Sequence, residues 1–207
     1  MSELASGPAI AVSWSRRALD LVLAALGLLA LSPLMLVIAV AIRLESRGPV
    51  LFRQLRVGAG GAPFTILKFR SMRQVSSGPE VTSRDDARVT RVGRRLRRAG
   101  LDELPQLVNV LRGEMTLVGP RPETPSLAAR YPPELRDVFR YRPGLTGPAQ
   151  LSLRDEDALA SGTTDVQAHY LTDVVPRRVA VDLEFQTRPS LRATVAVLRD
   201  TLVYVTH

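Results

Sequence analysis

The sequence lacks cysteine entirely and contains only two histidines, His169 and His207. A disulfide framework, a thiolate zinc site and a cysteine nucleophile are therefore excluded. A histidine metal cluster and most acid–base schemes that depend on histidine are disfavoured for the same reason. Carboxylates, hydroxyls and arginines remain as the groups that would carry any chemistry.

Lysine and aromatic residues are also scarce. Lys68 is the only lysine among the 28 basic residues, and aromatic residues make up 5% of the chain. The formal charge of +8 indicates an anionic partner, which could be nucleic acid, an anionic membrane or a phosphorylated substrate. Few aromatic side chains leave little for base stacking, so nucleic acid is the least favoured of the three.

The charge-free segment Leu21–Ile42 is 22 residues long. As a helix it would measure roughly 33 Å, enough to cross a hydrocarbon core of about 30 Å. A core helix of a soluble protein is rarely apolar on every face over this length. A secretory signal is disfavoured because no small-x-small cleavage site follows and Arg43 comes directly after the segment.

Ser32-Pro33 lies at the middle of this apolar segment. Pro33 has no N–H to donate to Leu29 and its ring clashes with the preceding turn, so a sharp kink is predicted. The Ser32 hydroxyl would satisfy part of the freed backbone. Arginines flank the segment on both sides, and this disfavours placing either end outside the cell. A re-entrant hairpin is therefore preferred to a simple spanning helix, which remains the alternative.

The rest of the chain predicts a small α+β domain. Val50–Val57 and Phe64–Arg70 alternate as strands around a turn at 58–63, which indicates a β-hairpin. Residues 74–86 form a predicted loop, and Tyr141–Gln150 forms another. A basic amphipathic helix through Val89, Val92 and Leu96 precedes a second helix in ELPQLVNVLRGEM, ending at Gly113.

The last predicted helix carries an apolar stripe through Leu191, Val195, Leu198 and Leu202, bordered by arginines. Such a stripe packs either into a core or onto a membrane surface, and both readings stay open.

An adjacent acid pair, Asp102-Glu103, follows a stretch with six arginines between Arg88 and Arg98. Neighbouring cations should lower both carboxyl pKa values, so both groups are predicted to be ionised. Ionised carboxylates suit a nucleophile or a Mg²⁺ ligand better than a general acid. By itself the pair is a weak motif, because an acid pair that caps a helix would look the same.

Several segments together resemble one family. They are GPVLFRQLRVG, FTILKFRSM, RVGRRLRRAGLDELPQLVNVLRGEMTLVGPRPE and YRPGLTGPAQ. This ordered set is similar to the bacterial sugar transferases, and specifically to the small monotopic phosphoglycosyl transferases that act on polyprenol phosphate. The resemblance extends from SRRALDLVLA to the last helix and so covers nearly the whole chain.

The resemblance implies a mostly helical α+β fold with a re-entrant membrane helix broken at Ser32-Pro33, interfacial amphipathic helices and a small globular part. It implies a membrane-embedded segment at 1–47 and a catalytic domain at 48–207. The globular part is expected on the cytoplasmic face of the inner membrane.

The implied reaction transfers a sugar 1-phosphate from a nucleotide sugar, usually a UDP-sugar, to polyprenol phosphate. It is expected to depend on Mg²⁺ and to pass through a covalent aspartyl-phosphosugar intermediate. The products are UMP and a polyprenol-diphosphate sugar, and the reaction is the first membrane step of glycoconjugate assembly.

The resemblance assigns roles residue by residue. Asp102 matches the nucleophile, and Glu103 matches its partner and Mg²⁺ ligand. The implied substrate-binding residues are Lys68, Arg97, Pro120, Arg121, Pro122 and Arg142. The family commonly has Ser or Thr two residues before the nucleophile, where this chain has Gly100, and weaker helix capping is expected there.

Two other function classes remain as alternatives, a non-catalytic membrane-anchored subunit and a basic nucleic-acid-binding module. The intact acid pair argues against the first and the few aromatics against the second, so no nucleic-acid partner is predicted. The sequence leaves open the identity of the sugar, the glycan pathway and the oligomeric state, a homodimer included.

Overall fold

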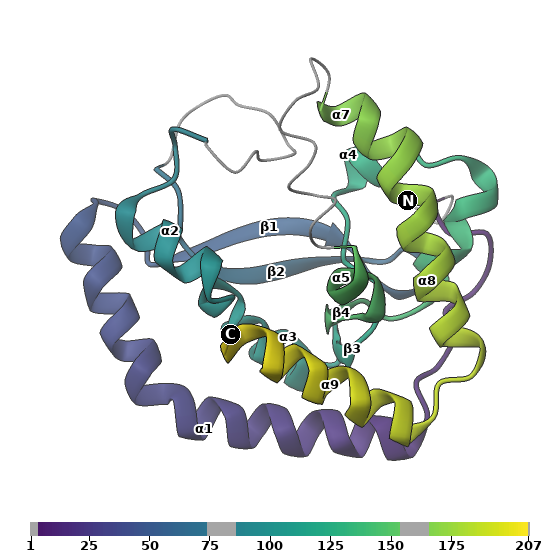
Figure 1. Ribbon diagram of the computed structural model, residues 1–207, viewed down its shortest axis with the longest axis horizontal. Helices are drawn as coiled ribbons and strands as arrows, with labels where there is room; N and C mark the ends of the chain where they lie inside the picture. Colours follow the sequence, from purple (N-terminus) through teal and green to yellow (C-terminus); the bar gives the residue numbers. More distant parts are fainter. Residues whose placement is uncertain (1–3, 74–85, 154–165, 207) are drawn as a thin grey trace.

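The computed structural model describes residues 4–73, 86–153 and 166–206. Figure 1 shows a long helix, α1 (Trp14–Glu45), that curves around a body containing an antiparallel hairpin. The hairpin consists of β1 (Leu51–Val57) and β2 (Pro63–Phe69). The other elements are α2 (Arg91–Arg98), α3 (Gln106–Arg112), β3 (Thr116–Val118), α4 (Pro125–Ala128), β4 (Gly144–Thr146), α5 (Pro148–Ser152), α7 (Val166–His169), α8 (Val175–Thr187) and α9 (Leu191–Thr206). The predicted mostly helical α+β class is confirmed.

The hairpin forms where the alternating pattern predicted it, with Leu51 opposite Phe69 and Val57 opposite Pro63. Two glycines of the connecting turn, Gly60 and Gly61, have positive φ, a conformation that glycine adopts without steric cost. The outer edge of β2 has no third strand among the described residues. Asn109 of α3 takes that place.

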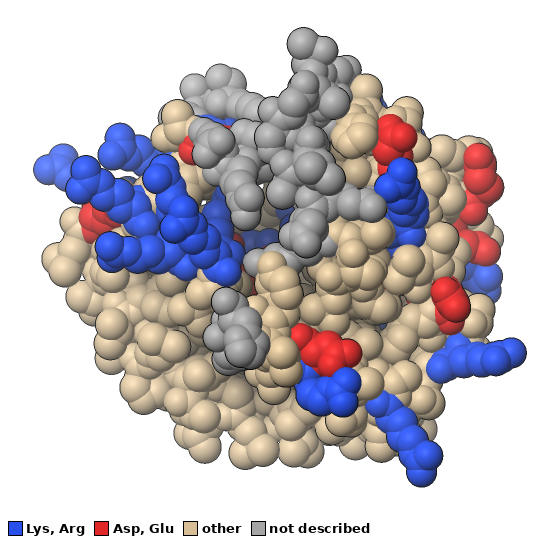
Figure 2. Space-filling view, in the orientation of Figure 1, with Lys and Arg blue, Asp and Glu red and all other residues tan. Residues whose placement is uncertain are grey.

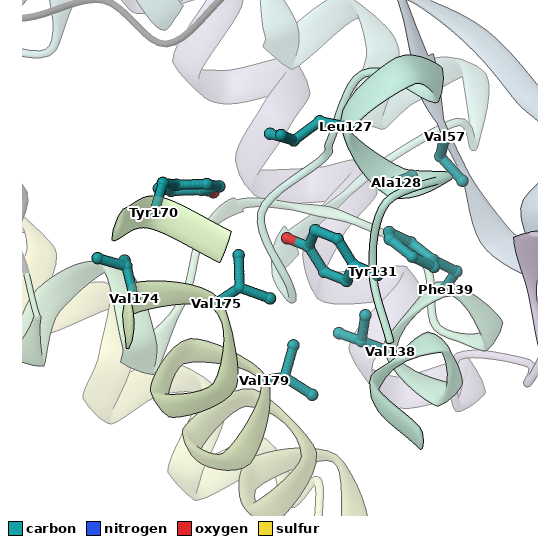
Figure 3. Packing of buried hydrophobic residues seen from close by; sticks show 10 residues of the cluster. All are labelled: Val57, Leu127, Ala128, Tyr131, Val138, Phe139, Tyr170, Val174, Val175 and Val179. Carbon is teal, nitrogen blue, oxygen red and sulfur yellow. The ribbon is translucent and has the colours of Figure 1, made fainter. Parts of the chain in front are cut away.

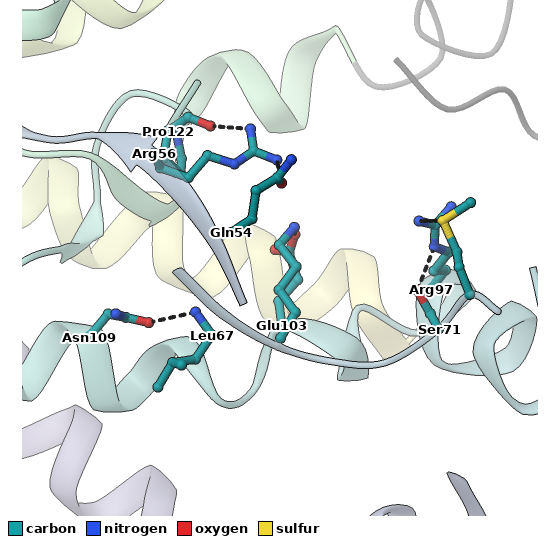
Figure 4. Close-up of polar contacts among 10 residues, drawn as sticks. Gln54, Arg56, Leu67, Ser71, Arg97, Glu103, Asn109 and Pro122 are labelled. Atoms are coloured by element: carbon teal, nitrogen blue, oxygen red, sulfur yellow. Dashed lines mark hydrogen bonds and ion pairs between the residues drawn. The ribbon is translucent and has the colours of Figure 1, made fainter. Parts of the chain in front are cut away.

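The Asn109 side chain accepts a hydrogen bond from the Leu67 amide at 3.1 Å (Figure 4). It also donates a hydrogen bond to Thr65 O at 2.8 Å. One carboxamide thereby bonds to β2 as a neighbouring strand would, and it fixes α3 against the hairpin. Asn109 is fully buried, so its polar atoms depend on these bonds.

α1 exposes much of its apolar surface. The exposed fractions are 75% for Leu29, 67% for Leu36 and 65% for Val37. Among the described residues it is the one helix that is long and apolar enough to cross a membrane. An exposed apolar face of this length is typical of contact with lipid or another apolar surface.

Pro33 lies inside α1, and the helix is continuous from Trp14 to Glu45 rather than divided into two helices by a turn. Figure 1 shows a pronounced bend between its purple N-terminal part and its blue C-terminal part. The Ser32 hydroxyl donates to Leu29 O at 2.8 Å, so it takes the acceptor that Pro33 leaves free. The bend therefore occurs without loss of helical structure.

The N-terminal end of α1 is anchored to the body by polar side chains. Asp20 is 1% exposed and accepts hydrogen bonds from Thr116 Oγ1 at 2.6 Å and from the Leu117 amide at 3.0 Å. Arg16, equally buried, donates to Val118 O at 2.8 Å. Arg17 donates to Val110 O at 2.7 Å, at the end of α3.

These contacts involve the two arginines, Arg16 and Arg17, that precede the apolar segment. The sequence predicts them as charges that flank a membrane segment. Instead they bond to backbone carbonyls inside the protein, because the ends of β3 and α3 leave acceptors without strand or helix partners.

The C-terminal end of α1 contacts the same body. Ile38 and Ile42 are buried against Phe69 and Leu96. Glu45 accepts hydrogen bonds from the first amides of α2, with Oε1 2.8 Å from the Arg91 amide. A carboxylate at a helix N-terminus is favourable because it satisfies free N–H groups and complements the helix dipole.

β3 and β4 form a parallel pair, with Thr116 opposite Gly144 and Val118 opposite Thr146. The sequence did not predict these strands, because three residues are too few to show alternation. The predicted loop at Tyr141–Gln150 therefore contains a strand and the start of α5.

The largest apolar cluster joins the segment after β3 to α8 (Figure 3). Tyr131 and Phe139 lie with ring centroids 5.1 Å apart, and Val175 and Val179 of α8 pack on them. The apolar stripe of α9 is divided between core and surface. Leu198 packs on a second apolar cluster, while Val195 and Leu202 are exposed.

We predict that Asp20→Ala lowers the free energy of unfolding by about 3 kcal/mol, because two hydrogen bonds to a charged group are lost and their donors stay buried. Detergent-solubilised protein would be unfolded with denaturant and monitored by circular dichroism. Asp200→Ala, which removes an exposed carboxylate, is the matched control. Equal stability of the two variants would show that the Asp20 anchor contributes little.

Candidate active site

The acid pair lies in a short 3₁₀ turn, Leu101–Glu103, between α2 and α3. Gly100 precedes it with φ 64°, in the left-handed region, and its carbonyl accepts the Glu103 amide at 3.3 Å. A side chain at this position would cost roughly 1–2 kcal/mol in that conformation. Glycine at residue 100 therefore permits the tight turn that presents the two acids.

Glu103 forms an ion pair with the single lysine of the chain. Lys68 Nζ lies 2.7 Å from Glu103 Oε1, and the two side chains are 17% and 25% exposed. Burial by itself would raise the pKa of Glu103, but Lys68 and Arg121 outweigh it and hold the pKa at about 2. Glu103 is therefore ionised over the whole neutral range, as the sequence predicted.

Asp102 behaves differently. Its side chain is buried, and this burial, together with the charge of Glu103, raises its pKa. Lys68 and Arg97 oppose the rise without cancelling it. The prediction that neighbouring arginines lower both pKa values is therefore wrong for Asp102, because desolvation and the charge of Glu103 outweigh the attraction of Lys68 and Arg97.

A small cleft opens beside Glu103. Its walls come from β1, β2, the turn at the start of α3, the segment after β3, and the region of β4 and α5. The polar side chains that line it are Arg56, Lys68, Glu103, Gln106, Arg121 and Gln150. Three cations and one ionised carboxylate give the lining of the cleft a net positive charge, which suits a polyanionic ligand such as a diphosphate.

The segment Gly119–Pro122 forms one wall and is held by backbone hydrogen bonds to β4. The Gly119 amide donates to Thr146 O at 2.9 Å, and the Gly144 amide donates to Pro120 O at 2.8 Å. A Cβ on Gly144 would lie 2.1 Å from the Gly119 nitrogen, so only glycine permits this close approach.

Arg56 of β1 supports the same wall. Its Nη1 donates to Pro122 O at 3.0 Å and its Nη2 donates to Gln54 at 2.7 Å (Figure 4). Burial, and then repulsion by Arg121, lower its pKa. Arg56 was not assigned a role from the sequence, because nothing in a strand pattern shows which arginine faces a distant loop.

A buried polar network lies behind this wall. Tyr170 donates its hydroxyl to Glu123 Oε1 at 2.5 Å, and Arg178 of α8 donates to the Tyr170 oxygen at 3.1 Å. Burial and the charge of Glu123 raise the pKa of Tyr170, so the phenol keeps its proton. Tyr170 begins a π-helical turn between α7 and α8, an irregularity that places its side chain in the network.

Comparison with known families gives one match over almost the whole chain: the model of the bacterial sugar transferase family matches residues 11–207. The chain belongs to the bacterial sugar transferase family. The resemblance seen in the sequence is thereby confirmed.

Curated relatives carry consistent names. A UDP-glucose:undecaprenyl-phosphate glucose-1-phosphate transferase of Caulobacter vibrioides is 48% identical over 93% of this chain and 70% of its own length. An undecaprenyl-phosphate glucose phosphotransferase of Komagataeibacter xylinus is 45% identical over 82% of this chain. A UDP-N-acetylgalactosamine-undecaprenyl-phosphate N-acetylgalactosaminephosphotransferase of Aeromonas hydrophila is 44% identical over 70% of this chain.

The lengths of these relatives differ from that of this chain. The matched region is 32% of the Komagataeibacter protein and 35% of the Aeromonas protein. This bacterial sugar transferase thus corresponds to about a third of those two relatives and to most of the Caulobacter one.

The residues predicted for a sugar transferase site come together only in part. Lys68, Glu103, Arg121 and Pro122 line the cleft. Asp102 adjoins it through Glu103 but is not among the lining residues. Pro120 holds the loop through its backbone carbonyl.

Two predicted arginines lie elsewhere. Arg97 donates to Ser71 Oγ at 2.9 Å, to one side of Glu103 in Figure 4, and acts on Asp102 through its charge. Arg142 does not line the cleft, and its electrostatic neighbours are Arg17 and Asp20 on α1. The role of Arg142 in substrate binding stays a prediction.

Three of the lining residues with polar side chains were not predicted for this sugar transferase: Arg56, Gln106 and Gln150. Gln106 follows the acid pair within the quoted motif, and Gln150 ends YRPGLTGPAQ. Their positions within the family motifs could have marked them as candidate site residues. Their orientation toward one cleft depends on the tertiary fold.

We predict that Lys68→Met lowers the free energy of unfolding at pH 7 by about 2 kcal/mol, because Glu103 loses its charged partner. A carboxylate with a lowered folded pKa stabilises the fold above its usual pKa of 4.5, and the contribution is lost as the pH falls toward 2. The difference between parent and variant should therefore shrink below pH 4.5.

Denaturant unfolding at pH 7 and at pH 3 measures the two differences. Arg199→Met, which breaks the exposed pair with Asp200, is the control and should change neither value measurably. A Lys68→Met defect of equal size at both pH values would mean that packing, not charge, is what Lys68 supplies.

Proposed function

We propose that this protein transfers a sugar 1-phosphate from a UDP-sugar to a polyprenol phosphate and releases UMP. The observation that carries the proposal is the cleft in which Lys68, Arg56 and Arg121 surround the Glu103 carboxylate next to Asp102. The named activities of its relatives support the reaction class and both substrates.

In the first step, an Asp102 oxygen attacks the phosphorus that carries the sugar. The P–O bond to UMP breaks, the electron pair leaves with UMP, and an acyl phosphate forms on Asp102. Developing negative charge on the phosphoryl oxygens would be stabilised by Lys68 and Arg121. Because burial raises the pKa of Asp102, its ionised form is a stronger nucleophile than an ordinary aspartate.

In the second step, a phosphate oxygen of the polyprenol phosphate attacks the same phosphorus. The bond to Asp102 breaks, the carboxylate is regenerated, and the sugar diphosphate is joined to the lipid. One diphosphate linkage replaces another, so the exchange needs no external energy source. An acyl phosphate is reactive enough to serve as the intermediate.

We also propose Glu103 as the protein ligand of Mg²⁺. The described residues contain no cluster of three or more acidic, His or Cys side chains. Mg²⁺ often binds proteins through one or two carboxylates plus substrate phosphates and water, and the ionised Glu103 beside Asp102 fits such a set. Bound there, the ion would neutralise charge on the diphosphate.

For the membrane we propose the re-entrant arrangement. Both ends of α1 bond to one globular body, through Asp20 at one end and Glu45 at the other. A helix that crosses a bilayer separates its ends by about 30 Å of hydrocarbon, so one body could not hold both. The exposed apolar face of α1 would enter the lipid from one side and leave on the same side.

Charge supports our proposal that the globular body lies on the cytoplasmic face of the inner membrane. The exposed arginines of α2 form a basic surface, the blue area over that helix in Figure 2; they are Arg91, Arg94, Arg95 and Arg98. Basic residues beside membrane segments favour the cytoplasmic side. α2 is joined to the end of α1 through Glu45, so this surface would lie near lipid headgroups.

We predict that Asp102→Asn abolishes UMP release from UDP-glucose in the presence of undecaprenyl phosphate and Mg²⁺, because an amide cannot form the acyl phosphate. Glu103→Gln, a matched change at the next residue, should still form a covalent adduct but require more Mg²⁺. Mass spectrometry of protein incubated with UDP-glucose and Mg²⁺, without undecaprenyl phosphate, locates the adduct. Asp137→Asn, on an exposed turn, is the control.

The structure makes this comparison informative, since Glu103 rather than Asp102 lines the cleft. An adduct on Glu103 in the parent would reverse the two assignments. UMP release that needs no undecaprenyl phosphate would indicate hydrolysis instead of transfer. Absence of UMP release with a panel of UDP-sugars would argue for a non-catalytic subunit.

We predict that cysteines introduced at Ser6 and at Arg47 are both shielded from an impermeant maleimide added to intact cells, because a re-entrant α1 keeps both its flanks inside. The native chain has no cysteine, so the background is clean. Labelling after permeabilisation shows that both cysteines are reactive. External labelling at either position alone would establish a spanning helix.

A further inference from the structure

Two glutamines in the cleft have buried polar atoms without partners. Gln106 is 2% exposed, and its Nε2 makes no hydrogen bond within the described structure. Gln150 Oε1 is likewise buried and unbonded. Leaving such a group unsatisfied costs about 1–3 kcal/mol, and native proteins rarely do so without a reason. Because both residues line the cleft, the two atoms are available to hydrogen-bond a molecule bound there.

The glutamines lie on different walls of the cleft. Gln106 begins α3, three residues after Glu103, and its amide lowers the Glu103 pKa as a weak hydrogen-bond donor, although the geometry at Nε2 falls short of a regular hydrogen bond. Gln150 belongs to α5, which follows β4. The fold thus brings to one site an amide nitrogen and a carbonyl oxygen that lack regular hydrogen bonds.

α5 is held in place by α8. Buried Asp182 accepts a hydrogen bond from the Ala149 amide, next to Gln150. Gly147 allows α5 to approach Gly119 closely, since a Cβ there would lie 2.4 Å from Gly119 O. Gln150 is therefore positioned by a packed framework rather than by a free loop.

The chemistry of the two atoms selects the ligand. A phosphate oxygen only accepts hydrogen bonds, so it would not satisfy Gln150 Oε1, and the cations Arg56, Lys68 and Arg121 already suit phosphates. A hydroxyl both donates and accepts, so it satisfies either glutamine. The lining of the cleft therefore combines cations, which suit a diphosphate, with neutral amides, which suit hydroxyls.

We propose that Gln106 and Gln150 bind hydroxyl groups of the sugar being transferred and so contribute to the choice of sugar. The inference rests on the proposed function, in which the sugar is attached to the phosphorus attacked beside Glu103. Gln106 and Glu103 line the same cleft, so a sugar attached to that phosphorus would lie within reach of the Gln106 amide.

The test compares Gln106→Leu and Gln150→Leu, which keep most of the side-chain volume and remove the hydrogen-bonding atoms. Isothermal titration would measure binding of UDP, UDP-glucose and UDP-N-acetylgalactosamine to the solubilised full chain. Each variant should lose about tenfold in affinity for at least one UDP-sugar, the value of one good hydrogen bond, while binding UDP as the parent does. The ratio of kcat/KM for the two sugars should change in parallel.

Gln186→Leu, at a buried glutamine of α8 that does not line the cleft, is the matched control and should leave all three affinities unchanged. Equal losses for UDP and for both UDP-sugars would overturn the proposal, since they would place the glutamines at the nucleotide. Unchanged affinities would also overturn it. Thermal unfolding of each variant identifies misfolding. If Gln106→Leu does not fold, the Gln150→Leu variant still tests the proposal, because Gln150 is less buried and its replacement perturbs the core less.

Failure of the inference and failure of the proposed function give different results. A parent that releases UMP, together with glutamine variants that bind every ligand normally, refutes only the role of the glutamines. A parent that releases no UMP from either UDP-sugar refutes the function, and the inference with it.

Discussion

The buried carboxylate of Asp20 is the contact on which the arrangement of the site depends. An ionisable group inside a long apolar helix is costly to bury unless it is fully hydrogen-bonded, and here β3 supplies both donors. This requirement fixes α1 against β3. β3 leads directly into Gly119–Pro122, the wall of the cleft, and β4 pairs beside it. The long apolar helix α1 and the cleft are therefore parts of one packed unit.

The two neighbouring acids show how strongly the surroundings of a carboxyl group change its pKa. Glu103 faces the cleft and bonds to Lys68, so its pKa is about 2, whereas Asp102 is buried and its pKa is raised. Pairs of carboxylates with separated pKa values commonly have separate tasks. In the proposed reaction, a stable anion suits the metal ligand, and a more basic carboxylate suits the nucleophile.

The surface around this unit is unusual for a protein surrounded by water. α1 and α9 both expose large apolar side chains, and α2 adds a surface of arginines at the end of α1 (Figure 2). Apolar faces beside a basic surface match the boundary between lipid tails and anionic headgroups. In the proposed membrane position, the anchors of α1 on β3 would hold the cleft near the lipid surface, where a polyprenol phosphate would be bound.

The sequence by itself determined the features that depend on local pattern or on an ordered set of motifs. These include the hairpin, the apolar helix with Pro33, the stop at Gly113 and the family. The tertiary structure decided which groups meet. Lys68 and Glu103 are 35 residues apart and Arg56 and Pro122 are 66 apart, so only the packing of α3 and β3 on the hairpin joins them. The raised pKa of Asp102 and the unbonded atoms of Gln106 and Gln150 are also tertiary, because burial is a property of the folded surroundings and not of neighbours in sequence.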